Sequence, residues 1–142
     1  MVRSAFEFFG KGLLATLVMG GLLVYFIYYS DMHAAEARVI AGRQLVETAC
    51  GSVEYGEQGD GFPVLVIHGA GGGYDQGLLI GDLLLGKDYR IIAPSRFGYL
   101  GADIPIDSSI EAQADVYACL LDALGVERAV VLGFSAGGPS AL

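Results

Sequence analysis

The longest apolar stretch of the chain lies close to its N-terminus. Residues 12–30 carry no charged side chain and are rich in Leu, Val, Ile, Phe and Tyr. A helix of this length measures about 28 Å, close to the thickness of the hydrocarbon core of a bilayer. The pattern therefore predicts a transmembrane helix at residues 12–30. An N-terminal leader, residues 1–11, precedes it, and a polar helical connector, residues 31–44, follows it.

Two other interpretations of this segment remain open. Residues 35–37 read Ala-Glu-Ala, the small-x-small pattern of a signal-peptide cleavage site, but the apolar stretch exceeds the usual 7 to 15 residues of a signal peptide. A buried core helix rarely lacks charge on all sides over such a length. The leader and the connector that flank the span contain two basic residues each, so charge does not decide its orientation. A first helix inserts most simply with its N-terminus in the cytoplasm, which would place the following domain outside.

Residues 45–142 alternate short apolar runs with helical patterns, as βαβ units do. The segments 44–49 and 52–57 can pair as a hairpin. Three continuous apolar runs have the character of strands buried on both faces of a parallel sheet, and they span residues 63–67, 89–93 and 129–133. The sequence therefore predicts an α/β domain with a parallel sheet behind an N-terminal hairpin.

Two helices are predicted between these strands. One follows a glycine loop and ends at Leu85. The other opens with Ser108 and Glu111, which have the spacing of a capping box, and ends at Gly125 as a C-cap.

Composition narrows the possible functions. The formal net charge of −8 and the lack of clustered cations argue against nucleic acid as a partner. Cys50 and Cys119 have neither metal nor redox spacing, and we interpret both as packing cysteines, with a disulfide between them as the alternative. His33 and His68 are the only imidazoles, and His33 adjoins the predicted span. We therefore expect no metal site and no cofactor.

Residues 133–137 read Gly-Phe-Ser-Ala-Gly and match the G-x-S-x-G pattern of a nucleophile elbow. The motif follows a predicted buried strand and precedes a plausible helix start, which is the context that such an elbow requires. Gly133 and Gly137 permit the tight turn. The pattern predicts that Ser135 projects its hydroxyl at the carboxyl end of the sheet.

A second motif, residues 68–73, reads His-Gly-Ala-Gly-Gly-Gly after the strand at 63–67. A loop with little side-chain bulk exposes backbone N–H groups to developing negative charge. We expect the N–H groups of Ala70 and Ala136 to form the oxyanion hole, with His68 and Gly69 shaping the loop. A dinucleotide-binding loop is the rival interpretation, but Tyr74 occupies the position of its third glycine.

Three motifs in this order resemble the α/β-hydrolase superfamily: His68-Gly69, Arg96-Phe97-Gly98-Tyr99 and the elbow at 133–137. The resemblance is greatest to bacterial hydrolases grouped with carboxylesterases, non-haem perhydrolases and C–C-bond hydrolases. It covers about residues 45–142 and implies an α/β-hydrolase fold that stops after the elbow. It also implies a serine hydrolase acting on an ester or related acyl substrate through Ser135, or, as an alternative, a perhydrolase or C–C-bond hydrolase. Family members typically have an acidic residue after the fourth strand, which residues 94–98 lack.

In this superfamily the triad acid and histidine follow the nucleophile in the chain. Seven residues follow Ser135 here, none of them charged or histidine. We therefore expect the 142-residue chain to be a fragment or truncated product that has no hydrolase turnover by itself. A non-catalytic membrane protein that keeps a hydrolase-like sheet to bind a partner is the alternative. The downstream coding sequence would distinguish the two.

Overall fold

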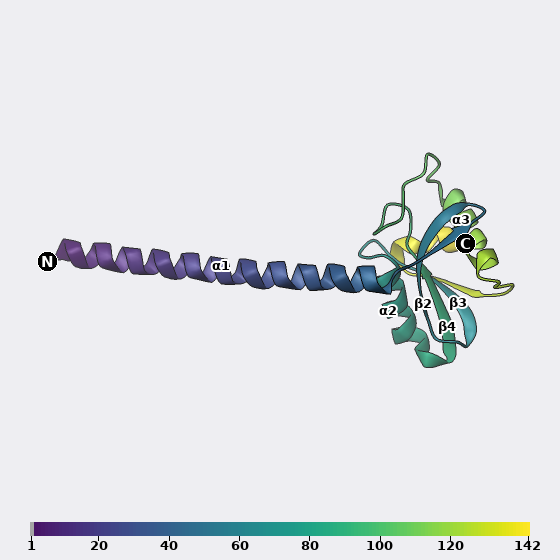
Figure 1. The fold of residues 1–142 in the computed structure, drawn as a ribbon, viewed down its shortest axis with the longest axis horizontal. Coiled ribbons are helices and arrows are strands. Elements are labelled where there is room, and N and C mark those ends of the chain that lie inside the picture. The colour runs from purple at the N-terminus through teal and green to yellow at the C-terminus, as the bar shows by residue number, and fades with distance from the viewer. Residues whose placement is uncertain (1) are drawn as a thin grey trace. The chain divides into compact units, whose positions relative to one another are not determined.

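The computed structural model describes the backbone of residues 2–142 and the side chains of residues 10–142. The chain forms two compact units, Met1–Ala41 and Gly42–Leu142. Helix α1, Val2–Gly42, makes up the first unit and is uninterrupted over 41 residues (Figure 1). The predicted connector is therefore a continuation of the predicted span rather than a separate element. Met1 and the side chains of the predicted leader before Gly10 lie outside the described residues.

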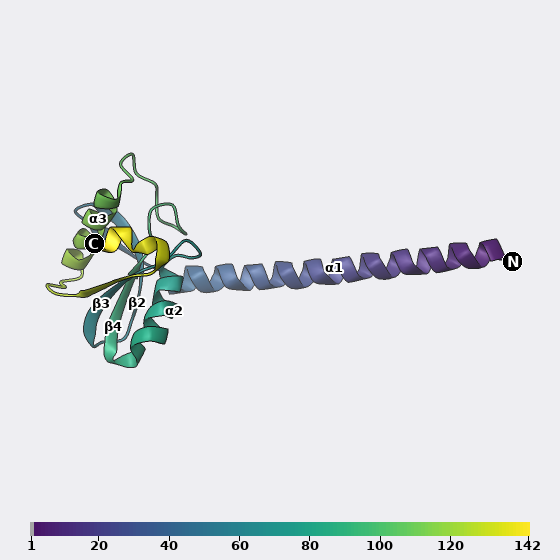
Figure 2. The same ribbon diagram turned by 180° about the vertical axis from the view of Figure 1, so that it is seen from behind.

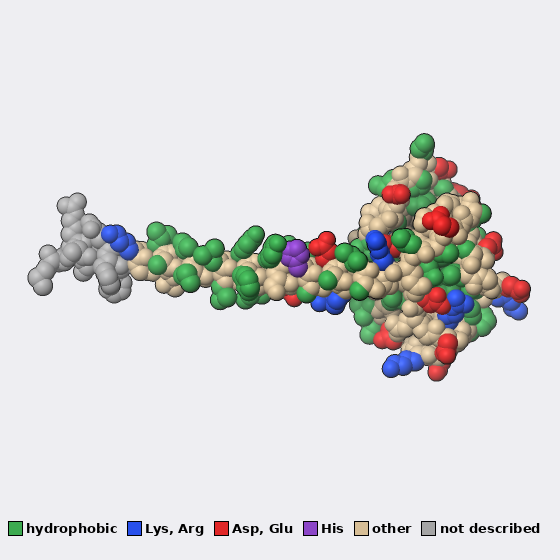
Figure 3. All heavy atoms as spheres, in the orientation of Figure 1, with side chains coloured by type: hydrophobic (Ala, Val, Ile, Leu, Met, Phe, Trp, Pro, Cys, Tyr) green, Lys and Arg blue, Asp and Glu red, His purple; other side chains and the backbone are tan. Residues whose placement is uncertain are grey.

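Within α1, the segment Gly10–Gly42 is long and apolar enough to cross a membrane by length and composition, and no part of its most apolar window is buried. Figure 3 shows its hydrophobic side chains on the surface of the helix.

The second unit is built on a mixed five-stranded sheet with the order β1-β2-β4-β3-β5. The predicted hairpin forms from β1, Gln44–Thr48, and β2, Gly51–Gln58, and β2 also pairs antiparallel with β4. The predicted parallel strands are β3, Phe62–Ile67, β4, Tyr89–Pro94, and β5, Val130–Gly133. β3 lies between β4 and β5 and is parallel to both. The carboxyl ends of all three strands therefore meet at one edge of the sheet.

One helix covers each face of the sheet (Figures 1 and 2). Because side chains alternate along a strand, β3 supplies both cores. Leu65 and Ile67 pack in the cluster that includes Tyr117 and Leu120 of α3, Ile110–Ala123. Val64 and Val66 pack on the opposite face with Ile80 of α2, Tyr74–Leu85. A short 3-10 turn, Gly86–Asp88, links α2 to β4.

The start of α3 differs from the predicted capping box. Ser109, not Ser108, is the N-cap, and its hydroxyl accepts a hydrogen bond from Ala112 N at 3.1 Å. Asp107 accepts from Ser109 N at 3.0 Å, and the bonds from Ser109 lower the pKa of this carboxyl. The helix therefore begins one residue later than predicted. At the other end of α3 the C-cap is Leu124, one residue before the predicted Gly125. Gly125 directly follows it with a φ of +66°, the left-handed conformation that commonly ends a helix.

The interpretation of the two cysteines as packing residues is wrong. Cys50, in the turn between β1 and β2, and Cys119, on α3, form a disulfide with a Cα–Cα distance of 6.0 Å. The spacing of 69 residues gives no local signal for this pairing. It arises because α3 packs against the sheet face beside the hairpin.

The predicted burial of the last strand is also wrong within the described residues. Val130 and Val131 of β5 are 54% and 44% exposed. β5 pairs only with β3 in the part of the chain that the structure describes, so its other edge and much of its two faces are open.

Candidate active site

Ser135 lies at a sharp turn directly after β5. Its φ is +50°, a left-handed conformation that non-glycine residues seldom adopt. The turn is fixed by hydrogen bonds on both sides of the serine: Phe134 N donates to Ile67 O at 2.9 Å, and Gly137 N donates to Phe134 O at 2.8 Å. Short 3-10 turns, Ser135–Gly137 and Pro139–Ala141, continue the chain. Strand, strained serine and helical turn together have the geometry of a nucleophile elbow.

The glycine loop after β3 lies directly beside this turn. β3 and β5 are parallel neighbours with Ile67 opposite Gly133, so the two loops leave the sheet side by side. A Cβ atom placed on Gly69 would lie 3.3 Å from the Cβ of Ser135. The sheet therefore brings together the serine and the predicted oxyanion loop.

The backbone N–H groups of this loop are not equivalent. The Gly69 N–H donates to Gln76 Oε1 at 2.8 Å and is thereby occupied. The N–H groups of Ala70 and Ala136 donate to no other group among the residues that the structure describes. These are the two donors that the sequence predicts for an oxyanion hole, and both remain free to bind an oxygen atom.

His68 is fully buried and joins two loops. Its Nε2 accepts a hydrogen bond from Arg96 N at 2.9 Å, so Nδ1 carries the proton and donates to Gly69 O at 2.7 Å. Burial lowers the pKa of His68, although the bond to Gly69 opposes this shift, and the ring is therefore neutral. With both nitrogens engaged, His68 cannot accept a proton from Ser135, and it has no lone pair available for a metal.

A buried carboxylate, which sequence reasoning missed, supports the loop after β4. Glu54 is 2% exposed, and its Oε1 accepts from Ser95 Oγ at 2.8 Å and from Gly101 N at 3.1 Å. Its Oε2 lies 3.7 Å from the guanidinium of Arg43. The Ser95 hydroxyl in turn accepts from Tyr74 N at 3.2 Å. Glu54 thus connects the β4 loop to the start of α2.

This network accounts for the missing acidic residue after β4. β2 pairs with β4, with Tyr55 opposite Pro94. This pairing brings the carboxylate of Glu54 next to Ser95, in the segment after β4 that has no acidic residue of its own. The one local signal for Glu54 was a charged residue in an otherwise buried strand segment.

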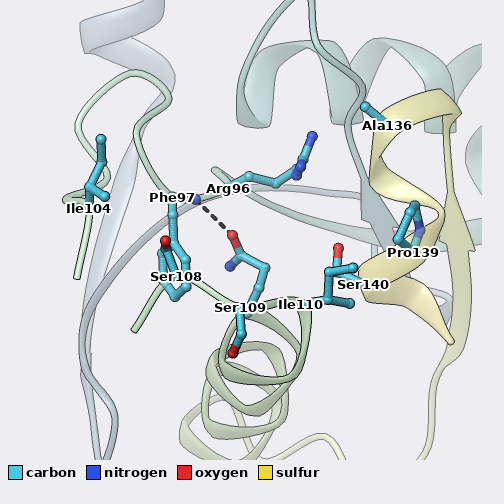
Figure 4. A pocket seen from close by; sticks show the side chains of 10 residues that line it. Arg96, Phe97, Ile104, Ser108, Ser109, Ile110, Ala136, Pro139 and Ser140 are labelled. Atoms are coloured by element: carbon cyan, nitrogen blue, oxygen red, sulfur yellow. Dashed lines mark hydrogen bonds between the residues drawn. The ribbon is translucent and has the colours of Figure 1, made fainter. Parts of the chain in front are cut away.

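No role at the site was predicted from the sequence for two further side chains, although one of them, Arg96, belongs to a family motif. Arg96 and Gln113 both line a cleft of about 370 Å³ that Ala136 borders as well. Figure 4 shows Arg96 and Ala136 in this cleft. Gln113 Oε1 accepts from Phe97 N at 2.8 Å, and the Arg96 guanidinium lies 5.5 Å from the centre of the Tyr99 ring. Gln113 belongs to α3, where a polar residue next to the apolar face gives no sign that it is buried.

Comparison with known proteins identifies the family. Residues 63–142 match the model of the alpha/beta hydrolase fold. A 2-hydroxymuconate semialdehyde hydrolase of Pseudomonas putida is 35% identical over 89 residues, which are 61% of this chain and 32% of that protein.

Two solved structures show the same likeness. An alpha/beta hydrolase fold protein from Nakamurella multipartita has a TM-score of 0.62 and 44% identity, over 70% of this chain and 34% of that one. An esterase from Exiguobacterium antarcticum has a TM-score of 0.59 and 25% identity, over 69% and 37%. The chain spans about a third of the length of the curated relatives it matches. The family model covers more than half of the chain, with the glycine loop, Arg96 and the elbow inside the matched region. The chain therefore belongs to the α/β-hydrolase fold family.

Proposed function

We propose that Ser135 is the nucleophile of a serine hydrolase that cleaves an ester or a related acyl substrate. The observation that carries this proposal is the strained conformation of Ser135, with φ at +50°, beside a loop that offers a free backbone N–H. Backbone strain of this kind costs of the order of 1–3 kcal/mol and is concentrated at functional sites. A mere turn between a strand and a helix has no need of it.

The geometry suggests a division of roles in acyl transfer. The Ser135 Oγ would attack the scissile carbonyl while a base removes its proton, and the carbonyl electrons would move onto the oxygen. The N–H groups of Ala70 and Ala136 would stabilise that oxyanion. Collapse of the intermediate would break the bond to the leaving oxygen, which would take the proton back from the base and depart as the alcohol. Water, deprotonated by the same base, would then attack the acyl group on Ser135, and the acid would leave as the serine hydroxyl is restored. Because both nitrogens of His68 are engaged, the base must be a different group.

A second candidate is hydrolysis of a carbon–carbon bond by the same elbow. It is favoured by the likeness to the 2-hydroxymuconate semialdehyde hydrolase of Pseudomonas putida. The esterase from Exiguobacterium antarcticum favours ester chemistry instead. The elbow and the oxyanion loop suit both reactions, so the two candidates share Ser135 and differ in the bond that is cleaved.

Covalent labelling tests the nucleophile directly. The natural protein that carries these residues should react with a fluorophosphonate probe and release 4-nitrophenol from 4-nitrophenyl acetate. Ser135→Ala should abolish both signals, whereas Ser52→Ala, a change at an exposed serine of β2, should leave both intact. A protein that is folded but unlabelled would support the non-catalytic alternative, and labelling that survives Ser135→Ala would remove Ser135 from the mechanism.

We also propose that α1 anchors the protein in a membrane with the hydrolase domain outside the cytoplasm. The apolar length of Gly10–Gly42 supports the anchor. The Cys50–Cys119 disulfide supports the location, because disulfides persist mainly in oxidising compartments.

A further inference from the structure

The cleft beside the elbow is lined by three segments of the second unit. The loop after β4 contributes Arg96, the start of α3 contributes Gln113, and the elbow turn contributes Ala136 and Ser140. Its volume of about 370 Å³ lies in the range of small-molecule sites. A molecule in the cleft would contact Ala136, the residue that directly follows the proposed nucleophile.

Arg96 brings an unpaired cation into this cleft. Its Nε and Nη1 atoms are buried without a hydrogen-bond partner among the described residues. Arg43 and Arg90 pair with Glu54 and Glu57, but no carboxylate pairs with Arg96 anywhere in residues 10–142. Buried charged donors are nearly always hydrogen-bonded in native proteins, so a missing acceptor requires an explanation.

The position of the guanidinium is fixed in spite of this missing acceptor. The backbone N of Arg96 is bound to His68 Nε2, and the side chain lies over the ring of Tyr99. In Figure 4 the side chain extends from the loop towards the turn that carries Ala136. The cation is therefore held in place beside the elbow instead of turning out to solvent.

Gln113 adds a second unpaired donor. Its Oε1 accepts from Phe97 N at 2.8 Å, which fixes the orientation of the amide, and its Nε2 is buried without a partner among the described residues. The Tyr117 hydroxyl is buried beside Arg96 and Ser140, whose side chains oppose the rise in its pKa that burial causes. The unpaired nitrogen atoms of Arg96 and Gln113 can only donate hydrogen bonds. Their common complement is an anionic oxygen acceptor.

We propose that Arg96 and Gln113 form a subsite for a carboxylate that the substrate carries in addition to its scissile carbonyl. The planar guanidinium presents two parallel N–H groups that match the two oxygens of a carboxylate. The oxyanion of the reaction has its own donors in Ala70 and Ala136, so Arg96 is left to recognise a permanent negative charge. The inference rests on the proposed function of Ser135 and specifies the class of substrate that it cleaves.

A matched pair of esters tests the subsite in the natural protein. Mono-4-nitrophenyl glutarate has a free carboxylate, and its methyl ester has none. We expect kcat/KM to favour the anionic ester, and Arg96→Gln to lower the anionic-to-neutral ratio about tenfold to a hundredfold, the range for a lost charge-assisted hydrogen bond, mainly through KM. Arg96→Lys, which keeps the charge but loses the fork, should give an intermediate ratio. Arg128→Gln, at an exposed arginine outside the cleft, should not change it.

If Arg96→Gln and Arg96→Lys lower kcat/KM equally for both esters, Arg96 only supports the fold. An anionic-to-neutral ratio of kcat/KM that Arg96→Gln leaves unchanged would also overturn the proposal. Binding of glutarate to the Ser135→Ala variant, measured by calorimetry, separates this outcome from failure of the proposed function. Binding that disappears in Ser135→Ala/Arg96→Gln supports the subsite even if Ser135 performs no catalysis. Ser135-dependent turnover of the neutral ester without glutarate binding would leave the proposed function standing and refute the subsite.

Discussion

Gly137 is the position at which a single methyl group should disturb the candidate active site most directly. A Cβ atom at this residue would lie 2.5 Å from His68 O and 2.6 Å from Ile67 O. Both oxygens are backbone atoms at the end of β3, and Ile67 O also accepts the hydrogen bond from Phe134 N. The strand cannot give way as a flexible side chain would, so the elbow turn has to move.

The size of the movement follows from the contact distances. An ordinary contact begins at 3.4 Å, so Gly137→Ala requires a displacement of about 0.9 Å at the closest oxygen. Overpacking of this kind costs about 1–3 kcal/mol of stability. A misplacement of about 1 Å in a catalytic group lowers the rate on the order of a hundredfold. We therefore expect the second-order rate of fluorophosphonate labelling at Ser135 to fall by about that factor.

The neighbouring glycine provides the control. At Gly138 the nearest atom to an added Cβ is Ser135 O at 3.3 Å, and the backbone is helical with φ of −57° and ψ of −48°. Gly138→Ala should therefore label within about threefold of the unsubstituted protein, because alanine favours a helical backbone. If folded Gly137→Ala protein labels as fast as Gly138→Ala, the close approach of the elbow to β3 does not position Ser135.

Three further predictions concern the rest of the molecule. Non-reducing peptide mapping should recover Cys50 and Cys119 in one linked fragment, and two free thiols in the untreated protein would refute the pairing. Cys119→Ser should lower the free energy of unfolding by at most about 4 kcal/mol, the loop-entropy value for a ring of this length. Burial lowers the pKa of His68 in the folded state, so the unfolded chain binds the proton more readily. Tm should therefore be highest above the ordinary pKa of 6.5 and should fall as the pH drops below it. The His68→Asn variant should lack this part of the pH dependence of Tm. The mature protein should retain residues 12–30 and resist carbonate extraction from membranes, whereas a mature N-terminus near Glu36 would reveal a cleaved signal peptide.

The sequence alone determined the features that depend on local patterns. Continuous apolar runs identified the three parallel strands. Two of them, β3 and β4, are buried on both faces and therefore have no polar alternation. The G-x-S-x-G pattern after such a run located the elbow, since the two glycines and the strained serine all lie within residues 133–137. The long uncharged segment likewise predicted a helix, and α1 extends over the whole of it. In each case the residues that decide the structure are close neighbours in sequence.

The tertiary structure alone decided which distant residues complete the site. Glu54 reaches Ser95 because β2 pairs with β4, and Cys50 reaches Cys119 because α3 packs beside the hairpin. Arg96 and Gln113 meet at one cleft for the same reason, since the loop after β4 lies against the start of α3. None of these pairs has a sequence spacing that would reveal it. Their contacts depend on strand order and helix docking, which are set by burial of the two apolar faces of the sheet and not by any local pattern.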